Sequence, residues 1–428
     1  MTVRRIGLVS SSGQSNWISC QAIVPNLEVA YRQAFGERLK AYSLNEEMRE
    51  GDLCNLALQI SRDRPSRLIF VDHRPHPIRL LRWLRDFYGS APLPELVFHV
   101  YGDFTFHSGA WMDLRPLLLD SKVRFVCASE RQGQLLTRFL KDGNSSISIC
   151  PFPVDTEIFH FDPKARGRYR KQLGLSDHEI LIAYAGRLSL QKNVTRLVKE
   201  FAELLPSERA PMHLVLAGSF DDIGAPFFGI NSRMGYCFQQ WQSILNEFSS
   251  KVRSRIHYVG SLEPQELAGL YCGADLFASL SLHHDEDFGM APAEALCCGT
   301  PVVLTNWGGY ASFSGKSCEL VPVRIHDLGL TVCSKDFRAA LLRQCQTSLS
   351  NGDRKKMGQR FSARYSIPAV GDEVRKISRL KSPKFRGFNW RMQKYAQSNT
   401  GNGAHFPSGP TAGTFYEEIY GVYVGAAQ

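Results

Sequence analysis

The 428-residue sequence predicts two doubly wound α/β domains, each built on a parallel sheet. Short runs rich in Val, Ile, Leu and Phe recur along the chain, and a loop and then a helical pattern follow each of them. The alternation stops once, at a basic stretch near residue 165, and then starts again. A chain of this length exceeds one ordinary core, so two domains of roughly 150 to 200 residues are expected.

The first domain is placed at residues 1–165. Its buried parallel strands are expected where apolar runs show no alternation with polar residues, at 6–9, 68–71, 96–100 and 123–127. A helix is expected over residues 78–88, because four apolar side chains recur there at helical spacing: Leu80, Leu81, Leu84 and Phe87.

The second domain is placed at residues 166–372, after a polar, basic stretch from Asp162 to Lys171 that we interpret as a linker. Its strands are expected at 180–185, 213–217, 256–259, 276–278 and 302–304, with helices at 194–205 and 264–271. Sheets of this kind bind ligands beyond the carboxyl ends of their strands. The residues that follow these runs are therefore the candidates for a site.

The remainder, residues 373–428, is predicted to be a basic crossover segment, a flexible connector and a short terminal helix. Eight Lys and Arg residues and no acidic residue lie between Arg375 and Lys394, and they account for most of the net charge of +10. The rest of the chain is nearly neutral, which does not indicate a general nucleic-acid surface. Residues 397–413 are rich in Ser, Gly, Asn and Pro, as linkers are.

Eleven cysteines without a C-x-x-C pair predict free thiols in a reducing cytoplasm and no zinc site. The amino terminus has no signal-like apolar region, and no run approaches the ~20 apolar residues of a membrane span. We therefore expect a cytoplasmic protein.

The most informative segment runs from Asp285 to Val303. It passes from a strand end through an acidic loop into a helix that begins near Gly289, so Glu286 precedes the helix and Glu294 lies inside it. Eight residues of helix rise ~12 Å, and the two carboxylates bracket the first-turn amides. This arrangement suits a sugar nucleotide, with the diphosphate on the helix end. The alternative is an ordinary loop carboxylate and an ordinary helix-surface carboxylate.

Three motifs carry a resemblance to a known family. Residues 286–294 read E-x-F-G-x-x-x-x-E and, with the following ALCCGTPVV, resemble the signature of family four of the retaining glycosyltransferases. Residues 185–192 resemble its G-R-x-x-x-x-K segment, and residues 153–159 resemble the stretch that ends its first domain. The resemblance implies the GT-B fold, in which two Rossmann-like domains face a cleft.

The resemblance also implies roles for single residues. Arg187 and Lys192 would hold the donor diphosphate, Glu286 the donor sugar and Glu294 the ribose. Two fixed cations can stabilise the charge of a leaving diphosphate, work that a metal often does. We therefore expect no required metal or cofactor, although the cluster from Asp285 to Asp287 leaves a metal site as an alternative. The full expected donor-binding set is Gly13, Arg187, Lys192, Glu286, Phe288, Gly289, Met290 and Glu294, of which Arg187, Lys192 and Glu286 are also the expected catalytic residues.

The acceptor side is less defined. Gly13 lies in a loop after the first strand, where its backbone amide suits a ligand. Tyr101 stands where relatives often carry a histidine, while His99 lies two positions earlier on the same strand face and His73 follows another strand. A structural role is the alternative for each histidine. After the pair Gly308 and Gly309, which suggests close approach of backbone to ligand, the glutamate common in relatives is missing.

The sequence thus predicts an enzyme, a retaining glycosyltransferase of the hexosyltransferase class. The expected acceptor is a glycan or glycolipid, in assembly of a surface polysaccharide or lipopolysaccharide. A nucleotide-sugar epimerase and a catalytically silent glycan-binding protein of the same fold are the alternatives. Phe385, Phe388 and Trp390 interleave with the basic residues 375–394, which predicts peripheral contact with the inner membrane face. The alternative is a solvated crossover that packs on the first domain.

Overall fold

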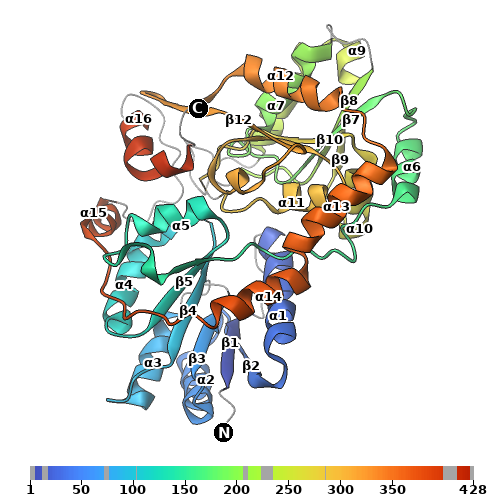
Figure 1. Ribbon diagram of the computed structural model, residues 1–428. Helices are drawn as coiled ribbons and strands as arrows, with labels where there is room; N and C mark the ends of the chain where they lie inside the picture. The colour runs from blue at the N-terminus through green and yellow to red at the C-terminus, as the bar shows by residue number, and fades with distance from the viewer. Residues whose placement is uncertain are drawn as a thin grey trace. The chain divides into compact units, whose positions relative to one another are not determined.

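A computed structural model of the chain describes residues 5–11, 18–71, 77–102, 104–205, 211–222, 235–284, 286–398 and 412–424 (Figure 1). The chain separates into two compact units, each an α/β unit on a parallel sheet. Unit 1 comprises Met1–Val154 and Tyr365–Gly401, and unit 2 comprises Asp155–Arg364 and Asn402–Gln428. The boundary lies at residue 154 where 165 was expected. Residues 373–428 form no separate part, because their first portion packs on unit 1 and their last on unit 2.

Unit 1 contains six parallel strands in the order β2-β1-β3-β4-β5-β6. Every residue of β1 and β5 is buried, as expected for a sheet covered on both faces. The strands are β1 Ile6–Ser10, β2 Leu39–Ser43, β3 Arg67–Phe70, β4 Glu95–Val100, β5 Val123–Cys127 and β6 Ile147–Ile149. The helices between them are α1 Ile18–Phe35, α2 Glu50–Asp63, α3 Ile78–Tyr88, α4 Ser108–Leu118 and α5 Glu130–Thr137.

The basic crossover closes unit 1. Helix α14 (Ile367–Ile377) packs along α1 and helix α15 (Trp390–Ser398) along α4. The extended chain between these helices pairs beside β5, where Val123 N–H donates to Pro383 O at 3.1 Å. Phe385 and Phe388 are buried there. Their rings are therefore not available at a membrane surface, which corrects the interleaved arrangement expected from the sequence; Trp390 alone of the three is exposed.

Unit 2 repeats the architecture with the strand order β12-β11-β10-β7-β8-β9. The strands are β7 Ile180–Ala185, β8 Met212–Ala217, β9 Ile256–Gly260, β10 Leu276–Ser279, β11 Val302–Thr305 and β12 Cys318–Val321, and the antiparallel hairpin is β13 Val323–His326 with β14 Gly329–Val332. The helices are α6 Pro163–Gln172, α7 Val194–Leu204, α8 Tyr236–Glu247, α9 Ser250–Arg253, α10 Pro264–Gly273, α11 Met290–Cys297, α12 Ser334–Cys345, α13 Asn351–Tyr365 and α16 Ala412–Phe415.

The expected linker is in fact helix α6. Asp162 caps it by accepting from Lys164 N–H at 2.8 Å, and proline occupies its first turn. The basic residues that made the stretch look like a linker are paired: Arg166 and Arg170 contact Asp275 at 2.7 and 3.0 Å. These two ion pairs to one carboxylate hold α6 against the rest of unit 2.

The last described segment, Ala412 to Val424, belongs to unit 2. It forms α16, then a single wider helical turn over Tyr416–Tyr420 and a 3₁₀ turn over Gly421–Tyr423. The expected connector over residues 397–413 lies almost wholly outside the described residues. No helix in the described ranges is long and apolar enough to cross a membrane. All eleven cysteines are free thiols.

Candidate functional site

The expected donor-binding residues that the structure describes all belong to unit 2 and follow the carboxyl ends of neighbouring strands. Arg187 comes two residues after β7, and Glu286 lies in the loop between β10 and α11. Strands β7 and β10 are hydrogen-bonded neighbours in the parallel sheet. The loops after them therefore meet at one edge, the edge at which such sheets bind ligands.

Lys192 and Glu286 form an ion pair. The ammonium Nζ of Lys192 lies 2.6 Å from Oε2 of Glu286, and the side chains are 18% and 8% exposed. At this low solvent exposure each charge stabilises the other, because an unpaired buried charge is costly. The pair holds the Glu286 carboxylate in a defined position in front of α11.

Arg187 is held by a residue that the sequence analysis missed. Its Nη1 lies 2.7 Å from Oδ2 of Asp221, and its Nη2 donates to Gln191 Oε1 at 3.3 Å. Asp221 follows β8, and the two loops are laced by backbone bonds such as Leu188 N–H to Ser219 O at 2.8 Å. Only the adjacency of β7 and β8 in the sheet brings this carboxylate to Arg187, and no local sequence pattern signals it.

Two neighbouring side chains place Arg187, Lys192 and Glu286 in one electrostatic environment. Burial, followed by the charges of His284, Lys192 and Arg187, holds the pKa of His283 well below its usual value. Burial and then the Glu286 charge raise the pKa of Tyr184, while Arg187 opposes that shift. Arg187 acts on both rings, Lys192 on His283 and Glu286 on Tyr184, so the three charged residues share one buried environment.

Helix α11 begins directly after the loop that carries Glu286. Its N-cap, Gly289, has φ +102°, and a Cβ there would lie 2.6 Å from the ring of Tyr310, so only glycine fits. Phe288 is buried with its ring 5.4 Å from that of Phe313. Met290 opens the helix, whose first-turn amides point away from the helix body and suit an anion.

Glu294 is buried inside α11 and is not the surface carboxylate of the alternative interpretation. Its Oε2 accepts from the Tyr271 hydroxyl at 3.2 Å. Burial raises the pKa of Glu294 to about 8, and the Tyr271 hydrogen bond opposes part of that shift. With this pKa the neutral acid is the main form of the Glu294 side chain at neutral pH.

The paired glycines approach protein backbone instead of open space for a ligand. Gly309 N–H donates to Glu286 O at 2.6 Å, and a Cβ on Gly309 would lie 2.2 Å from the carbonyl carbon of Asp287. The pair therefore lets two loops lie in contact. Asp285 is outside the described residues, and across the described ranges no three His, Cys, Asp or Glu side chains gather as metal ligands.

The acceptor-side candidates fall in unit 1. His73 lies outside the described residues, as does Gly13, which was expected to bind the donor. His99 is buried in β4, where its Nε2 lies 2.7 Å from the Tyr31 hydroxyl and burial lowers its pKa to about 3. Tyr101 is buried with its ring 5.0 Å from that of Phe152. These surroundings favour structural roles for both residues.

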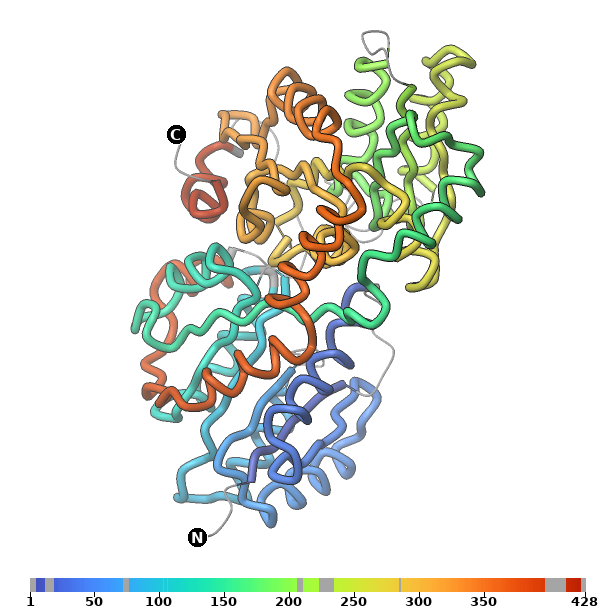
Figure 2. The backbone as a smooth tube through the Cα atoms, turned by 45° about the vertical axis from the view of Figure 1, so that its right-hand side comes forward, coloured from blue at the N-terminus to red at the C-terminus, as the bar shows by residue number. Residues whose placement is uncertain are grey.

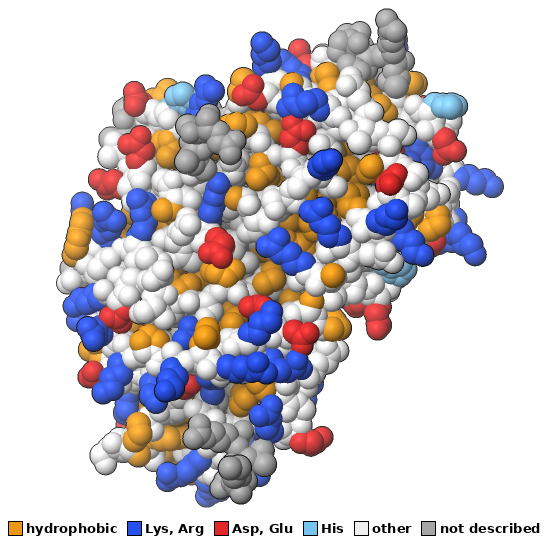
Figure 3. Space-filling view, in the orientation of Figure 1, with side chains coloured by type: hydrophobic (Ala, Val, Ile, Leu, Met, Phe, Trp, Pro, Cys, Tyr) orange, Lys and Arg blue, Asp and Glu red, His pale blue; other side chains and the backbone are white. Residues whose placement is uncertain are grey.

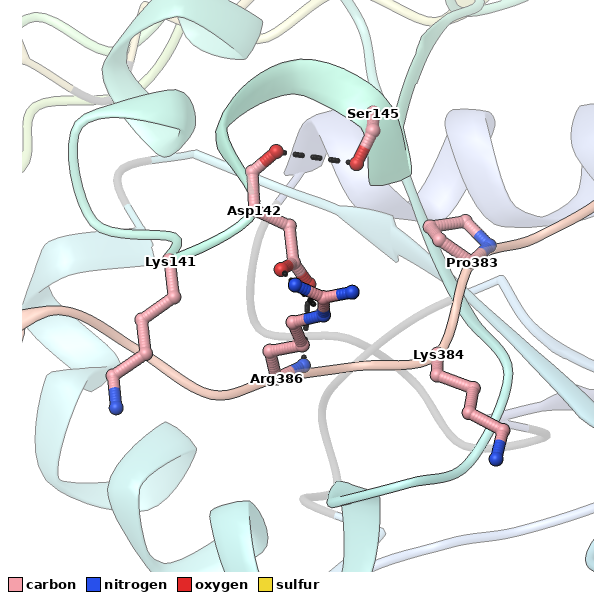
Figure 4. Close-up of a pocket in the computed structure, with 6 residues that line it drawn as sticks. All are labelled: Lys141, Asp142, Ser145, Pro383, Lys384 and Arg386. Carbon is pink, nitrogen blue, oxygen red and sulfur yellow. Dashed lines mark hydrogen bonds and ion pairs between the residues drawn. The ribbon is translucent and has the colours of Figure 1, made fainter.

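Unit 1 also carries a basic hollow of about 530 Å³, the basic pocket, lined by Lys141, Asp142, Ser145, Pro383, Lys384 and Arg386 (Figure 4). The guanidinium of Arg386 faces the Asp142 carboxylate, with Nε 3.6 Å from Oδ1. Lys141 and Lys384 lie on either side of that pair and extend away from it. On the face drawn in Figure 3, Lys and Arg side chains are mixed with acidic and apolar ones.

Residues 165–316 match the family model described as Glycosyl transferases group 1. Among curated proteins, the chain is 31% identical over 212 residues to the D-inositol 3-phosphate glycosyltransferase of Corynebacterium jeikeium, covering 46% of each chain. It is 28% identical over 193 residues to the mannosylfructose-phosphate synthase of Agrobacterium fabrum, covering 43% of this chain and 38% of that protein. The matches thus span less than half the length of these relatives.

The chain is also similar in structure to HepE of Anabaena, solved in complex with UDP and glucose. The TM-score is 0.59 at 16% sequence identity, and the match covers 88% of this chain and all of HepE. At that identity the similarity concerns the fold, which is the two-unit Rossmann-like architecture expected from the sequence.

Proposed function

Because residues 165–316 belong to the group 1 glycosyltransferases and the chain has the GT-B fold of its structural neighbours, we propose that it transfers a sugar, with retention of anomeric configuration, from a nucleotide-diphosphate-sugar donor. The observation that carries the proposal is the Lys192–Glu286 ion pair beside Arg187, at the edge of the unit 2 sheet from which α11 starts. The UDP bound to HepE, a protein of the same fold, supports the donor class.

Each charged residue then has a task set by its surroundings. Arg187 presents a fork for a diphosphate, and binding would draw it from Asp221, 2.7 Å away. Lys192 adds a second positive charge against the leaving group, so that fixed cations meet the charge that develops on the diphosphate. The first turn of α11 adds oriented amides without a metal.

The two carboxylates take opposite ends of the donor, Glu286 the sugar and Glu294 the ribose. The pairing of Glu286 with Lys192 makes it an acceptor of hydrogen bonds from sugar hydroxyls and a poor nucleophile, because its charge is already compensated. This supports a front-face route, in which the departing phosphate oxygen takes the acceptor proton, over a covalent sugar–enzyme intermediate. Glu294, buried beside Tyr271, would accept from the ribose diol.

The names of the relatives shift the proposed acceptor. Each of the two names contains a phosphorylated polyol or sugar, whereas the sequence predicts a glycan or glycolipid as the acceptor. We propose a small phosphorylated polyol or sugar as the acceptor. Transfer to the glycan of a surface polysaccharide is then an alternative outcome of the test and not the starting assumption.

The test incubates the full chain with UDP-, GDP- and ADP-sugars, each with inositol phosphate, fructose 6-phosphate or a glycan mixture as acceptor. Transfer to a phosphorylated small molecule, with the donor's anomeric configuration retained in the NMR spectrum of the product, is expected. Inversion would overturn the retaining mechanism, and transfer to glycans alone would overturn the acceptor class. Donor binding without turnover on any acceptor would favour the catalytically silent alternative, and change of the donor sugar without transfer would favour the epimerase.

Peripheral membrane contact through unit 1 is a second candidate function, and the basic pocket is the observation that favours it. Lys384 and Arg386 lie in the pocket wall, and Arg386 is 81% exposed at its side chain. Trp390, close by in sequence, is 65% exposed. Exposed cations and an exposed indole on one short segment suit an anionic headgroup layer.

A further inference from the structure

The last described segment packs on the loop that carries Glu286. This segment, residues 412–424, is the aromatic tail. The aromatic tail and the Glu286 loop are far apart in sequence, and the tail joins unit 2 only after the chain has passed through unit 1. Figure 2 shows the tail in red beside the orange part of unit 2.

The Glu286 loop is fastened to a turn that begins at Trp307. The Trp307 indole N–H donates to His283 O at 2.9 Å, and Gly309 N–H donates to Glu286 O at 2.6 Å. A Cβ on Gly308 would lie 2.5 Å from Glu286 O, so the turn and the loop are in direct contact. The backbone of Glu286 is therefore positioned by the turn, while its carboxylate is positioned by Lys192.

The aromatic tail covers that turn. The Trp307 ring is fully buried, with its centroid 5.4 Å from that of Tyr423 and 6.2 Å from that of Tyr420. Val424 forms an antiparallel bridge with Trp307, which ties the two backbones together. Tyr420 also reaches the loop itself, since its ring lies 5.6 Å from that of His284.

The far end of the tail is anchored at a separate place in unit 2. Gly413 N–H donates to Asp327 O at 3.0 Å, in the turn of the β13–β14 hairpin. A side chain at Gly413 would lie 2.5 Å from His326 O, so the contact needs glycine. Fixed at both ends, the aromatic tail is a strap over Trp307.

We propose that Tyr420 and Tyr423 are positioning residues, which hold Glu286 in its donor-binding geometry through Trp307. This inference rests on the proposed function for the role of Glu286, but the physical coupling between tail and loop does not. A loop held at one side only would let Glu286 move relative to Lys192. Geometry errors of about an ångström are costly in a transfer reaction.

The first test needs no substrate. Hydrogen exchange by mass spectrometry is measured on the full chain for peptides within residues 280–310 and, as an internal reference, for β7. Tyr423→Ala, Tyr420→Ala and Trp307→Phe are each expected to speed exchange in 280–310 at least tenfold and to leave β7 unchanged. Tyr423→Phe and Tyr420→Phe keep the rings and are expected to match the wild type. Glu417→Ala, an exposed site on the same tail, is the control.

The second test measures turnover. In the two alanine variants kcat is expected to fall at least tenfold, while the Kd for free UDP stays within threefold, because free UDP carries no sugar for Glu286 to hold. Unchanged exchange over 280–310, equal acceleration in β7, or a wild-type kcat in both alanine variants would each overturn the inference. If the wild type transfers no sugar at all, the proposed function fails, and the exchange experiment still decides whether the tail holds the loop.

Discussion

The ammonium of Lys192 lies 2.6 Å from the carboxylate of Glu286, although 94 positions separate the two residues. Each lies in the loop after a different strand of the unit 2 sheet, β7 for Lys192 and β10 for Glu286, so the pair depends on how that sheet is assembled. It also joins the two motifs that the sequence analysis assigned to the donor. The first prediction tests whether the pair acts as a unit.

Lys192→Met and Glu286→Gln are each expected to lower the free energy of unfolding by about 1.5 to 3 kcal/mol, because each leaves a buried charge without its partner. The double variant should lose less than the sum of the two. Urea denaturation of the four proteins measures the coupling. Lys199→Met is the matched control, since its pair with Glu247 is 3.9 Å long and half exposed. Strictly additive losses would contradict the coupling.

Arg187→Ala is expected to lower kcat about 100- to 1000-fold, because it removes a cation that we propose stabilises the leaving diphosphate. Chelation of divalent metals should leave the wild type active. Arg343→Ala, on an exposed pair with Glu319, serves as the control. Activity that disappears with chelator and returns with magnesium or manganese would instead assign the diphosphate to a metal.

Asp221→Asn is expected to raise the affinity for UDP severalfold. The Asp221 carboxylate lies 2.7 Å from Arg187 and would compete with a diphosphate bound there, and the amide would remove that competition while it keeps the side-chain shape. Calorimetry with UDP measures the change. A weaker affinity would mean that Asp221 chiefly orients Arg187.

Glu294 predicts a pH dependence of nucleotide binding. Its pKa is raised to about 8, and the proposed ribose contact would favour the ionised carboxylate, the better hydrogen-bond acceptor. Affinity for UDP should therefore increase from pH 6 to pH 8 and then level off, with a proton released on binding at pH 7. Glu294→Gln should abolish the pH dependence and the proton release, and Glu294→Ala should weaken binding by about 1 to 3 kcal/mol. A pH-independent wild type would remove Glu294 from the site.

The same group predicts how stability changes with pH. The folded pKa lies above the ordinary value of 4.5, so folding favours the protonated acid. That contribution is fully present below pH 4.5 and is lost as the pH rises through about 8. The wild type should lose stability relative to Glu294→Gln between pH 5 and pH 9 in parallel thermal melts. Parallel stability curves for the two proteins would contradict the shift.

Membrane contact through the basic pocket predicts salt-sensitive binding to anionic vesicles. Lys384→Ala and Arg386→Ala should each weaken sedimentation with phosphatidylserine vesicles about fivefold, since a cation near such a surface contributes about 1 kcal/mol. Lys199→Ala is the control on unit 2. Equal sedimentation with neutral and anionic vesicles at low salt would end the membrane hypothesis.

The buried strands were predictable because their apolar runs are continuous. The strand at 123–127 and the helix at 78–88 agree to the residue with β5 and α3. Strand β2 was missed because it lies at the sheet edge, and its sequence LKAYS is half exposed and has no apolar run. The GT-B fold that the family resemblance implied is confirmed, and residues 165–316 match the model of the expected family.

Contacts between distant segments account for what the sequence did not predict. Asp221 meets Arg187 and Tyr271 meets Glu294 only because neighbouring strands and helices bring their loops together. The basic stretch around Arg166 looked like a linker because its compensating charge, Asp275, lies more than a hundred positions away. The local sequence therefore gives no sign that Arg166 and Arg170 are paired with Asp275.

The path of the chain sets an order for its synthesis. Unit 2 begins at residue 155 but acquires its aromatic tail only after the helices that close unit 1 have been made. At ~5 to 20 residues per second on the ribosome, the Trp307 surface stays uncovered for several seconds after it emerges. During that interval the nascent chain exposes an aromatic face that the finished protein hides, and ribosome-associated chaperones would find it there. The loop that carries Glu286 is then covered only after the last part of unit 1 has been made.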